Sequence, residues 1–174
     1  MIILIAGASH TGKTNLAQKL MEKYHFPYLS MDLLKMGLIR SKQTNLTPYD
    51  DDKLTDYLWN IVKEIIKTAI ENEQDLIVEG CYIPYDWYTS FNEPYLSKIK
   101  YLCLVMTPEY IKTHFEDIKN YANVIEKRLD DSALNKDDLI KENEIAFKEC
   151  QKHHLNYILI EDKYDVEVVK NKTH

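Results

Sequence analysis

Five short apolar segments alternate along the chain with longer segments whose apolar residues recur every three or four positions. The apolar segments lie at 2–6, 26–30, 76–78, 101–105 and 155–160, and we predict a strand for each. The intervening segments predict helices that begin near Lys13, cover 33–38, follow the acidic run 50–52, span about 110–118 and cover 138–153. Most strand positions are apolar, so both faces of the sheet must be covered. The sequence therefore predicts an α/β fold, with a five-stranded parallel sheet between two layers of helices in a single domain over residues 1–174.

The helix expected after residue 50 has the most regular apolar stripe. The stripe consists of Leu54, Tyr57, Leu58, Ile61, Val62, Ile65, Ile66, Ala69 and Ile70. Such a stripe packs in the core or binds a partner, and core packing is favoured. The run 50–52 offers an N-cap and an acidic first turn. In contrast, 40–49 is polar and aperiodic, which predicts a loop.

A phosphate-binding motif follows the first predicted strand directly. The motif is G-x-x-x-x-G-K-[ST], matched by Gly7, Ala8, Ser9, His10, Thr11, Gly12, Lys13 and Thr14. Two glycines let the backbone wrap around a phosphate chain, and the helix that begins here adds its positive N-terminal dipole. We therefore expect residues 7–14, with Asn15 beside them, to bind a nucleoside triphosphate. Lys13 would contact the β and γ phosphates, and Thr14 would bind Mg²⁺.

Composition narrows the class of protein further. Hydrophobic residues make up 45% and charged residues 29% of the chain, which is typical of a globular protein, and no apolar run approaches the length of a membrane span. Three cysteines without C-x-x-C spacing (Cys81, Cys103 and Cys150) predict reduced thiols and a cytoplasmic location, with no signal peptide. A net charge of −6 disfavours a nucleic-acid partner.

Two further candidate residues stand at the predicted carboxyl ends of strands, where ligands bind in open parallel sheets. Asp32 follows the second strand, and Glu79 with Gly80 follows the third. A carboxylate there accepts a proton from a hydroxyl or holds Mg²⁺ through water, so Asp32 and Glu79 are both candidates for each role. The alternatives are that Asp32 caps the next helix and that Glu79 is a solvated strand end.

With the phosphate loop, Asp32 and Glu79-Gly80 in these places, the chain resembles the P-loop kinases of nucleotides and small metabolites, the group that includes adenylate kinase and shikimate kinase. The pattern of Asp32, Lys35, Arg40 and Glu79-Gly80 is most similar to 2-phosphoglycerate kinases and zeta-toxin-like kinases. The resemblance implies a three-layer αβα P-loop NTPase fold, an acceptor-side region at about 32–60 and a lid at about 119–137.

The same resemblance implies roles for the chain's two arginines, which the residues alone leave open as exposed surface charges. Arg128 would contact the transferring phosphoryl group from the lid. Arg40 would hold an anionic acceptor. Arginine suits both tasks because its planar fork matches phosphate and carboxylate groups.

The aromatic segment 82–95 has two interpretations. Its rings could line an acceptor pocket, or they could cover the edge of the sheet.

The sequence as a whole predicts an ATP- and Mg²⁺-dependent phosphotransferase that acts on a small-molecule or nucleotide acceptor. The alternatives are a nucleotide-binding regulatory NTPase that acts as a switch and, less favoured, a polynucleotide 5′-hydroxyl kinase.

Overall fold

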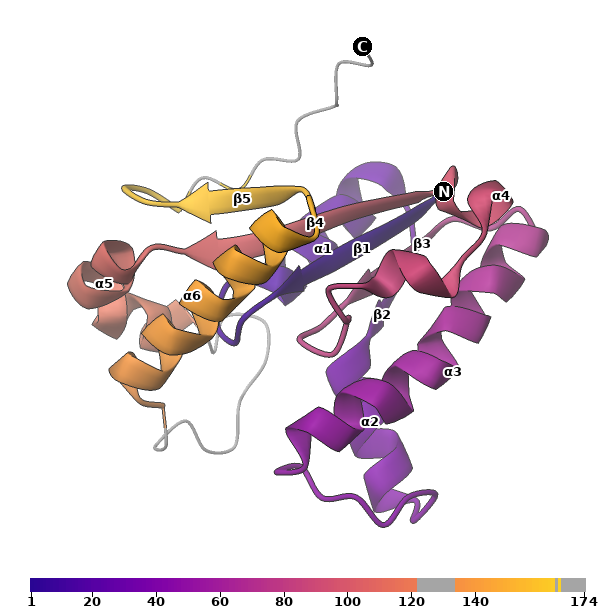
Figure 1. Ribbon diagram of the computed structural model, residues 1–174, viewed down its shortest axis with the longest axis horizontal. Coiled ribbons are helices and arrows are strands. Elements are labelled where there is room, and N and C mark those ends of the chain that lie inside the picture. The colour runs from indigo at the N-terminus through magenta and orange to yellow at the C-terminus, as the bar shows by residue number, and fades with distance from the viewer. Residues whose placement is uncertain (122–133, 165, 167–174) are drawn as a thin grey trace.

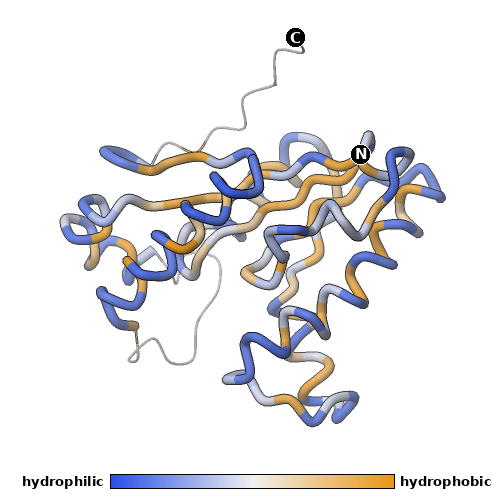
Figure 2. Tube along the Cα trace, in the orientation of Figure 1, coloured by the Kyte–Doolittle hydropathy of each residue, from blue (hydrophilic) through white to orange (hydrophobic). Residues whose placement is uncertain are grey.

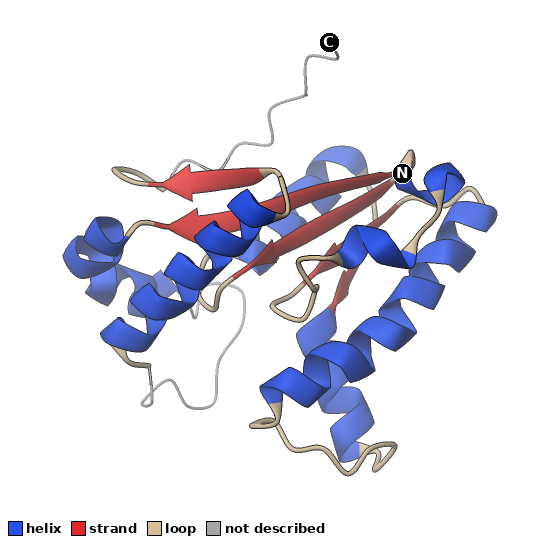
Figure 3. Ribbon diagram, viewed as in Figure 1, coloured by secondary structure: helices blue, strands red, loops and turns tan. Residues whose placement is uncertain are grey.

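A single five-stranded sheet organises the protein, whose computed structural model describes residues 1–121, 134–164 and 166 (Figure 1). All the strand pairs are parallel, in the order β2-β3-β1-β4-β5 (Figure 3). The strands are β1 (Ile2–Gly7), β2 (Tyr28–Ser30), β3 (Leu76–Glu79), β4 (Ile99–Met106) and β5 (Tyr157–Ile160). The helices are α1 (Lys13–Tyr24), α2 (Met31–Arg40), α3 (Asp51–Glu71), α4 (Glu93–Leu96), α5 (Pro108–Tyr121) and α6 (Lys136–Lys152), with a 3₁₀ helix η1 (Trp87–Ser90). The predicted α/β fold class with a parallel sheet is confirmed.

Helices cover both faces of the sheet, and the central strand β1 divides the core between them. Ile2 and Leu4 pack on one face with the buried stripe of α3, whereas Ile3 and Ile5 pack on the other with α1 and α5. Figure 1 shows α6 in front of the sheet and α1 behind it. The strands form the most continuously apolar part of the trace in Figure 2. Because both faces of the sheet are buried, the strand sequences are continuous apolar runs and do not alternate between apolar and polar residues.

The stripe of α3 is buried at Leu54, Leu58, Val62 and Ile66, so the prediction of core packing is confirmed. The N-cap prediction is confirmed only in position. Asp50 precedes the helix, but its carboxylate accepts hydrogen bonds from the backbone and hydroxyl of Thr47 and does not cap the backbone N–H groups of the helix. The Asp50 side chain therefore stabilises the turn that begins at Thr47 and not the first turn of the helix.

Several element boundaries differ from the prediction. α2 spans residues 31–40 rather than 33–38, so Asp32 lies in the first turn of a helix and not at the end of a strand. α6 begins two residues earlier than expected, and β5 begins at residue 157. Neither η1 nor α4 was predicted, because short helices carry little periodic signal.

Most of the expected lid falls outside the described residues. Of the predicted 119–137 segment, residues 119–121 end α5 and 136–137 begin α6, and residues 122–133, including Arg128, are not described. Within the described ranges, no helix is both long and apolar enough to cross a bilayer.

Candidate active site

The loop between β1 and α1 is held in its curved conformation by its own residues. Gly7 has a φ of +141° and Gly12 a φ of +82°, both in a region that L side chains rarely adopt. A Cβ atom at Gly7 would lie 2.5 Å from the carbonyl oxygen of Leu104, because the loop passes directly against β4. The buried hydroxyl of Thr11 donates to the carbonyl of Ala8 at 2.9 Å. The phosphate loop is therefore preformed.

Lys13, the first residue of α1, turns back over this loop. Its side chain is buried, and its Nζ donates to the carbonyl oxygen of Ala8 at 2.7 Å. Burial by itself would lower the pKa of Lys13, but the neighbouring Cys81 and Glu79 outweigh that effect and raise the pKa above its ordinary value. The ammonium group therefore stays charged at neutral pH, as a phosphate-binding lysine must.

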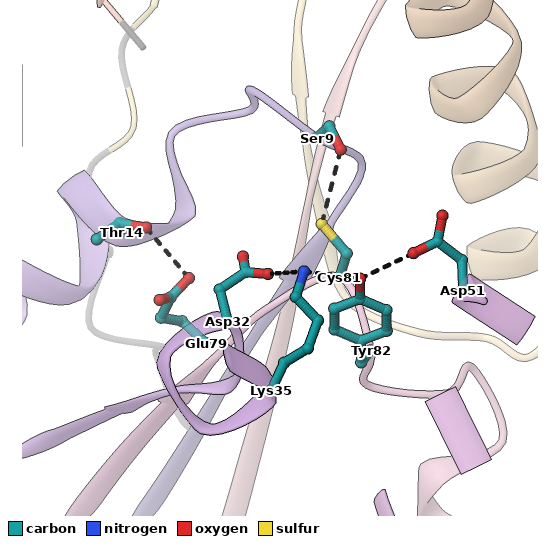
Figure 4. Close-up of polar contacts among 8 residues, drawn as sticks. All are labelled: Ser9, Thr14, Asp32, Lys35, Asp51, Glu79, Cys81 and Tyr82. Atoms are coloured by element: carbon teal, nitrogen blue, oxygen red, sulfur yellow. Dashed lines mark hydrogen bonds and ion pairs between the residues drawn. The ribbon is translucent and has the colours of Figure 1, made fainter. Parts of the chain in front are cut away.

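Thr14 and Glu79 form a hydroxyl–carboxylate pair at the mouth of the loop (Figure 4). Glu79 ends β3 beside β1, and its Oε2 accepts a hydrogen bond from the Thr14 hydroxyl at 3.3 Å. Mg²⁺ in phosphate-transfer sites keeps several waters and takes only one or two protein oxygens besides the phosphate oxygens. This pair fits that donor set.

A hydrogen-bonded chain of four residues links α2, the segment after β3 and α3 on the other side of the loop (Figure 4). Lys35 Nζ lies 2.6 Å from Asp32 Oδ1 and 3.0 Å from the Tyr82 hydroxyl. The Tyr82 hydroxyl in turn donates to Asp51 Oδ1 at 2.8 Å. Burial, together with the bond to Asp51, raises the pKa of Tyr82 above its ordinary value, so Tyr82 remains a neutral donor. The network fixes the position of the Asp32 carboxylate.

Glu142 is a site residue that sequence reasoning missed. It extends from α6, and its Oε2 accepts a hydrogen bond from the backbone N–H of Ser9 at 3.4 Å. Removal from bulk water raises the pKa of Glu142, and the nearby Asp51 raises it further. No motif could have identified Glu142. Its only signal is an acidic residue on a helix, next to the buried position Asn143.

Tyr164 is a second missed residue, and it lies beside the phosphate loop. Its hydroxyl donates to the carbonyl oxygens of Thr11 and Gly12 at 3.1 and 3.3 Å. Burial raises its pKa to about 12. Because Tyr164 follows β5, the rule that sites form at the carboxyl ends of strands could have found it.

One cavity of about 840 Å³ joins these groups. The predicted site residues that line it are Gly7, Ala8, Ser9, His10, Gly12, Lys13, Thr14, Asn15, Asp32 and Glu79. This volume lies within the range of about 300–1,000 Å³ usual for small-molecule sites. A second, more open cavity of about 890 Å³ lies between the end of α1 and α3, and it contains no residue of the phosphate loop. The first cavity is therefore the candidate active site.

The structure does not bring every predicted residue to this cavity. Thr11 is buried inside the loop, and Gly80 packs against Met31, where an added Cβ would lie 2.7 Å from the Met31 Cβ. Arg40 is exposed at the end of α2 and does not line the cavity. Arg128 lies outside the described residues, and its contact with the phosphoryl group stays a prediction.

Each of the two interpretations of the aromatic segment holds for some of its residues. Tyr82 and Tyr85 line the cavity. Trp87 instead stacks on Tyr101, with ring centres 5.6 Å apart, and packs with Phe91 in the core. The first tyrosines thus face the site, and the later rings cover the sheet.

Comparison with solved structures identifies the fold. A shikimate kinase from Bacteroides thetaiotaomicron superimposes with a TM-score of 0.51 at 14% identity, covering 95% of this chain and 89% of that one. A sugar kinase from Janibacter sp. HTCC2649 superimposes with a TM-score of 0.54 at 13% identity, covering 92% of this chain and 84% of that one. The chain has the P-loop kinase fold. No protein-family model matches this P-loop kinase-like chain, and no curated protein matches it.

Proposed function

We propose that this chain is a phosphotransferase that moves the γ-phosphoryl group of ATP to a hydroxyl group of a small molecule, with Mg²⁺. The observation that carries the proposal is the single cavity that joins the buried, charged Lys13 to the carboxylates of Asp32 and Glu79. A preformed phosphate loop with carboxylates opposite supplies what phosphoryl transfer needs, which is positioned charge and a proton acceptor. The likeness in fold to a shikimate kinase and a sugar kinase agrees with it.

The proposed reaction forms a bond between the acceptor oxygen and the γ-phosphorus. The bond from that phosphorus to the β–γ bridging oxygen breaks, ADP leaves, and the acceptor proton passes to Asp32. Lys35 holds one oxygen of this carboxylate at 2.6 Å, which orients Asp32 in the cavity. Lys13 binds the β and γ phosphates and places the phosphoryl group for in-line attack.

Thr14 and Glu79 are the residues that would hold Mg²⁺, the hydroxyl directly and the carboxylate through water. Bound there, the ion would neutralise charge on the phosphates. Asp32 and Glu79 therefore take different roles in this proposal, with Asp32 as the base and Glu79 at the metal.

The decisive test replaces the loop lysine. Lys13→Met keeps most of the side-chain length without its charge, and we expect it to lose Mg–ATP binding by calorimetry while retaining its circular dichroism spectrum. The control is Lys19→Met, an exposed lysine on the same helix. Equal ATP binding by wild type and Lys13→Met would remove the basis of the proposal.

Turnover distinguishes an enzyme from a regulatory NTPase. ADP release would be measured with nucleosides, nucleotides, sugars, sugar acids and amino sugars as acceptors. Stimulation by one class supports the phosphotransferase. Lys13-dependent ATP binding that no acceptor converts to turnover would favour the switch instead.

A further inference from the structure

The cavity carries an excess of negative charge. Six carboxylates line the cavity, from Asp32, Asp51, Asp52, Glu79, Asp117 and Glu142, against two lysines, Lys13 and Lys35. This excess of carboxylates over lysines is unusual for a site that must also bind a triphosphate.

Both lysines already form contacts with other groups of the protein. Lys13 is bound to the carbonyl of Ala8 within the phosphate loop. Lys35 forms an ion pair with Asp32 and donates to Tyr82. An anionic acceptor would therefore meet the remaining carboxylates, and among the described residues no other lysine lines the cavity to hold it. Arg40, the residue expected for that task, does not line the cavity.

Two of the carboxylates repel each other from elements far apart in the sequence. Asp51 lies at the start of α3 and Glu142 on α6, and the charge of Asp51 contributes to the raised pKa of Glu142. A positive group between them would relieve this repulsion.

An aromatic surface lies next to the same carboxylates. Tyr82 and Tyr85 both line the cavity, and the ammonium group of Lys35 already lies 4.9 Å from the centre of the Tyr82 ring. Tyrosine faces attract ammonium groups in this way. The wall of the cavity therefore suits a cation in both charge and surface.

We infer that the acceptor carries an ammonium group as well as the hydroxyl that is phosphorylated, as in an amino sugar or amino alcohol, with Asp51 and Glu142 binding the ammonium group. The inference rests on the proposed phosphotransferase function. It adds the substrate class, and it excludes phosphorylated acids and sugar acids as preferred acceptors.

The test compares acceptors that share a skeleton and differ in charge. The full-length chain would be assayed for ATP-dependent ADP release with two sets: glucosamine, glucose and gluconate, and 3-amino-1,2-propanediol, glycerol and glycerate. We expect the amine of at least one set to have a kcat/KM at least about tenfold above its neutral and anionic partners, the order of one charged interaction in an open cavity. The inference is overturned if the amine leads in neither set, or if no amine is turned over. Turnover of a sugar or an acid would still leave the phosphotransferase function standing.

Variants then test the assigned carboxylates. Glu142→Gln and Asp51→Asn should each lower kcat/KM for the best amine by about tenfold more than they lower it for the neutral partner of that amine. Glu144→Gln, an exposed residue on the same helix that does not line the cavity, is the control. Equal losses for the amine and its neutral partner would show that the two carboxylates act structurally, and they would overturn the assignment.

Discussion

Replacing Asp32 by asparagine separates the proposed chemistry from binding and folding. The substitution keeps the shape of the side chain and removes its charge. The ion pair with Lys35 is short, at 2.6 Å, but the Asp32 side chain is 42% exposed, so water screens the pair. Exposed pairs of this kind contribute about 0–1 kcal/mol. We therefore expect the free energy of unfolding of Asp32→Asn to lie within about 1 kcal/mol of the wild type.

The expected loss of turnover is much larger. General-base assistance contributes about 10²- to 10⁴-fold, which corresponds to about 3–5 kcal/mol of the barrier. ATP affinity should stay within a few-fold, because the loop and Lys13 hold the triphosphate. The assay measures kcat by ADP release with the best acceptor from the screen, and calorimetry measures ATP binding. Asp56→Asn, an exposed carboxylate on α3 that does not line the cavity, is the control.

Glu79→Gln provides the contrast to Asp32→Asn. We expect it to raise the Mg²⁺ concentration needed for half-maximal activity by about 10- to 100-fold, the usual effect of losing an outer-shell ligand partner. Activity should recover at high Mg²⁺. If Asp32→Asn keeps near-full turnover while Glu79→Gln is inactive at saturating Mg²⁺, the base is Glu79 and the assignment made here is wrong.

Four further predictions each concern a single residue. Urea unfolding should show that Gly7→Ala lowers the free energy of unfolding by more than about 1 kcal/mol, because the added Cβ would meet the Leu104 carbonyl at a strained φ. Gly37→Ala, with open space around it, should instead raise the free energy of unfolding by about 0.5–1 kcal/mol. The raised pKa of Glu142 means that the folded chain keeps this proton longer than the unfolded chain. Wild-type stability should therefore fall relative to Glu142→Gln as the pH rises above 4.5, in urea unfolding between about pH 4 and pH 7. Arg40→Ala should leave kcat/KM within about twofold, since Arg40 is exposed and outside the cavity, and a tenfold rise in acceptor KM would contradict this placement.

The strands and the phosphate loop could be predicted because their signals are local. Burial on both faces makes β1 an apolar run, and the glycines of the loop are required by backbone conformations at their own positions. Strand ends also pointed to Asp32 and Glu79, which the structure brings to one cavity.

The contributions of α6 and of the segment after β5 could not be predicted in the same way. Glu142 meets Ser9, and Tyr164 meets Thr11, through contacts that span more than a hundred positions in the sequence. No local periodicity or motif in the sequence predicts such a long-range contact. Arg40 shows the opposite kind of error. Its side chain has the right chemistry to bind an anion, but the fold leaves it outside the cavity.

The central position of β1 has a consequence for how the chain is made. β1 leaves the ribosome well before its partners β3 and β4, because Ile2 pairs with Leu76 and Ile99. At translation rates of about 5–20 residues per second, this apolar strand waits for about 5–20 s before both of its edges are filled. During that interval the nascent chain exposes an unpaired aggregation-prone segment.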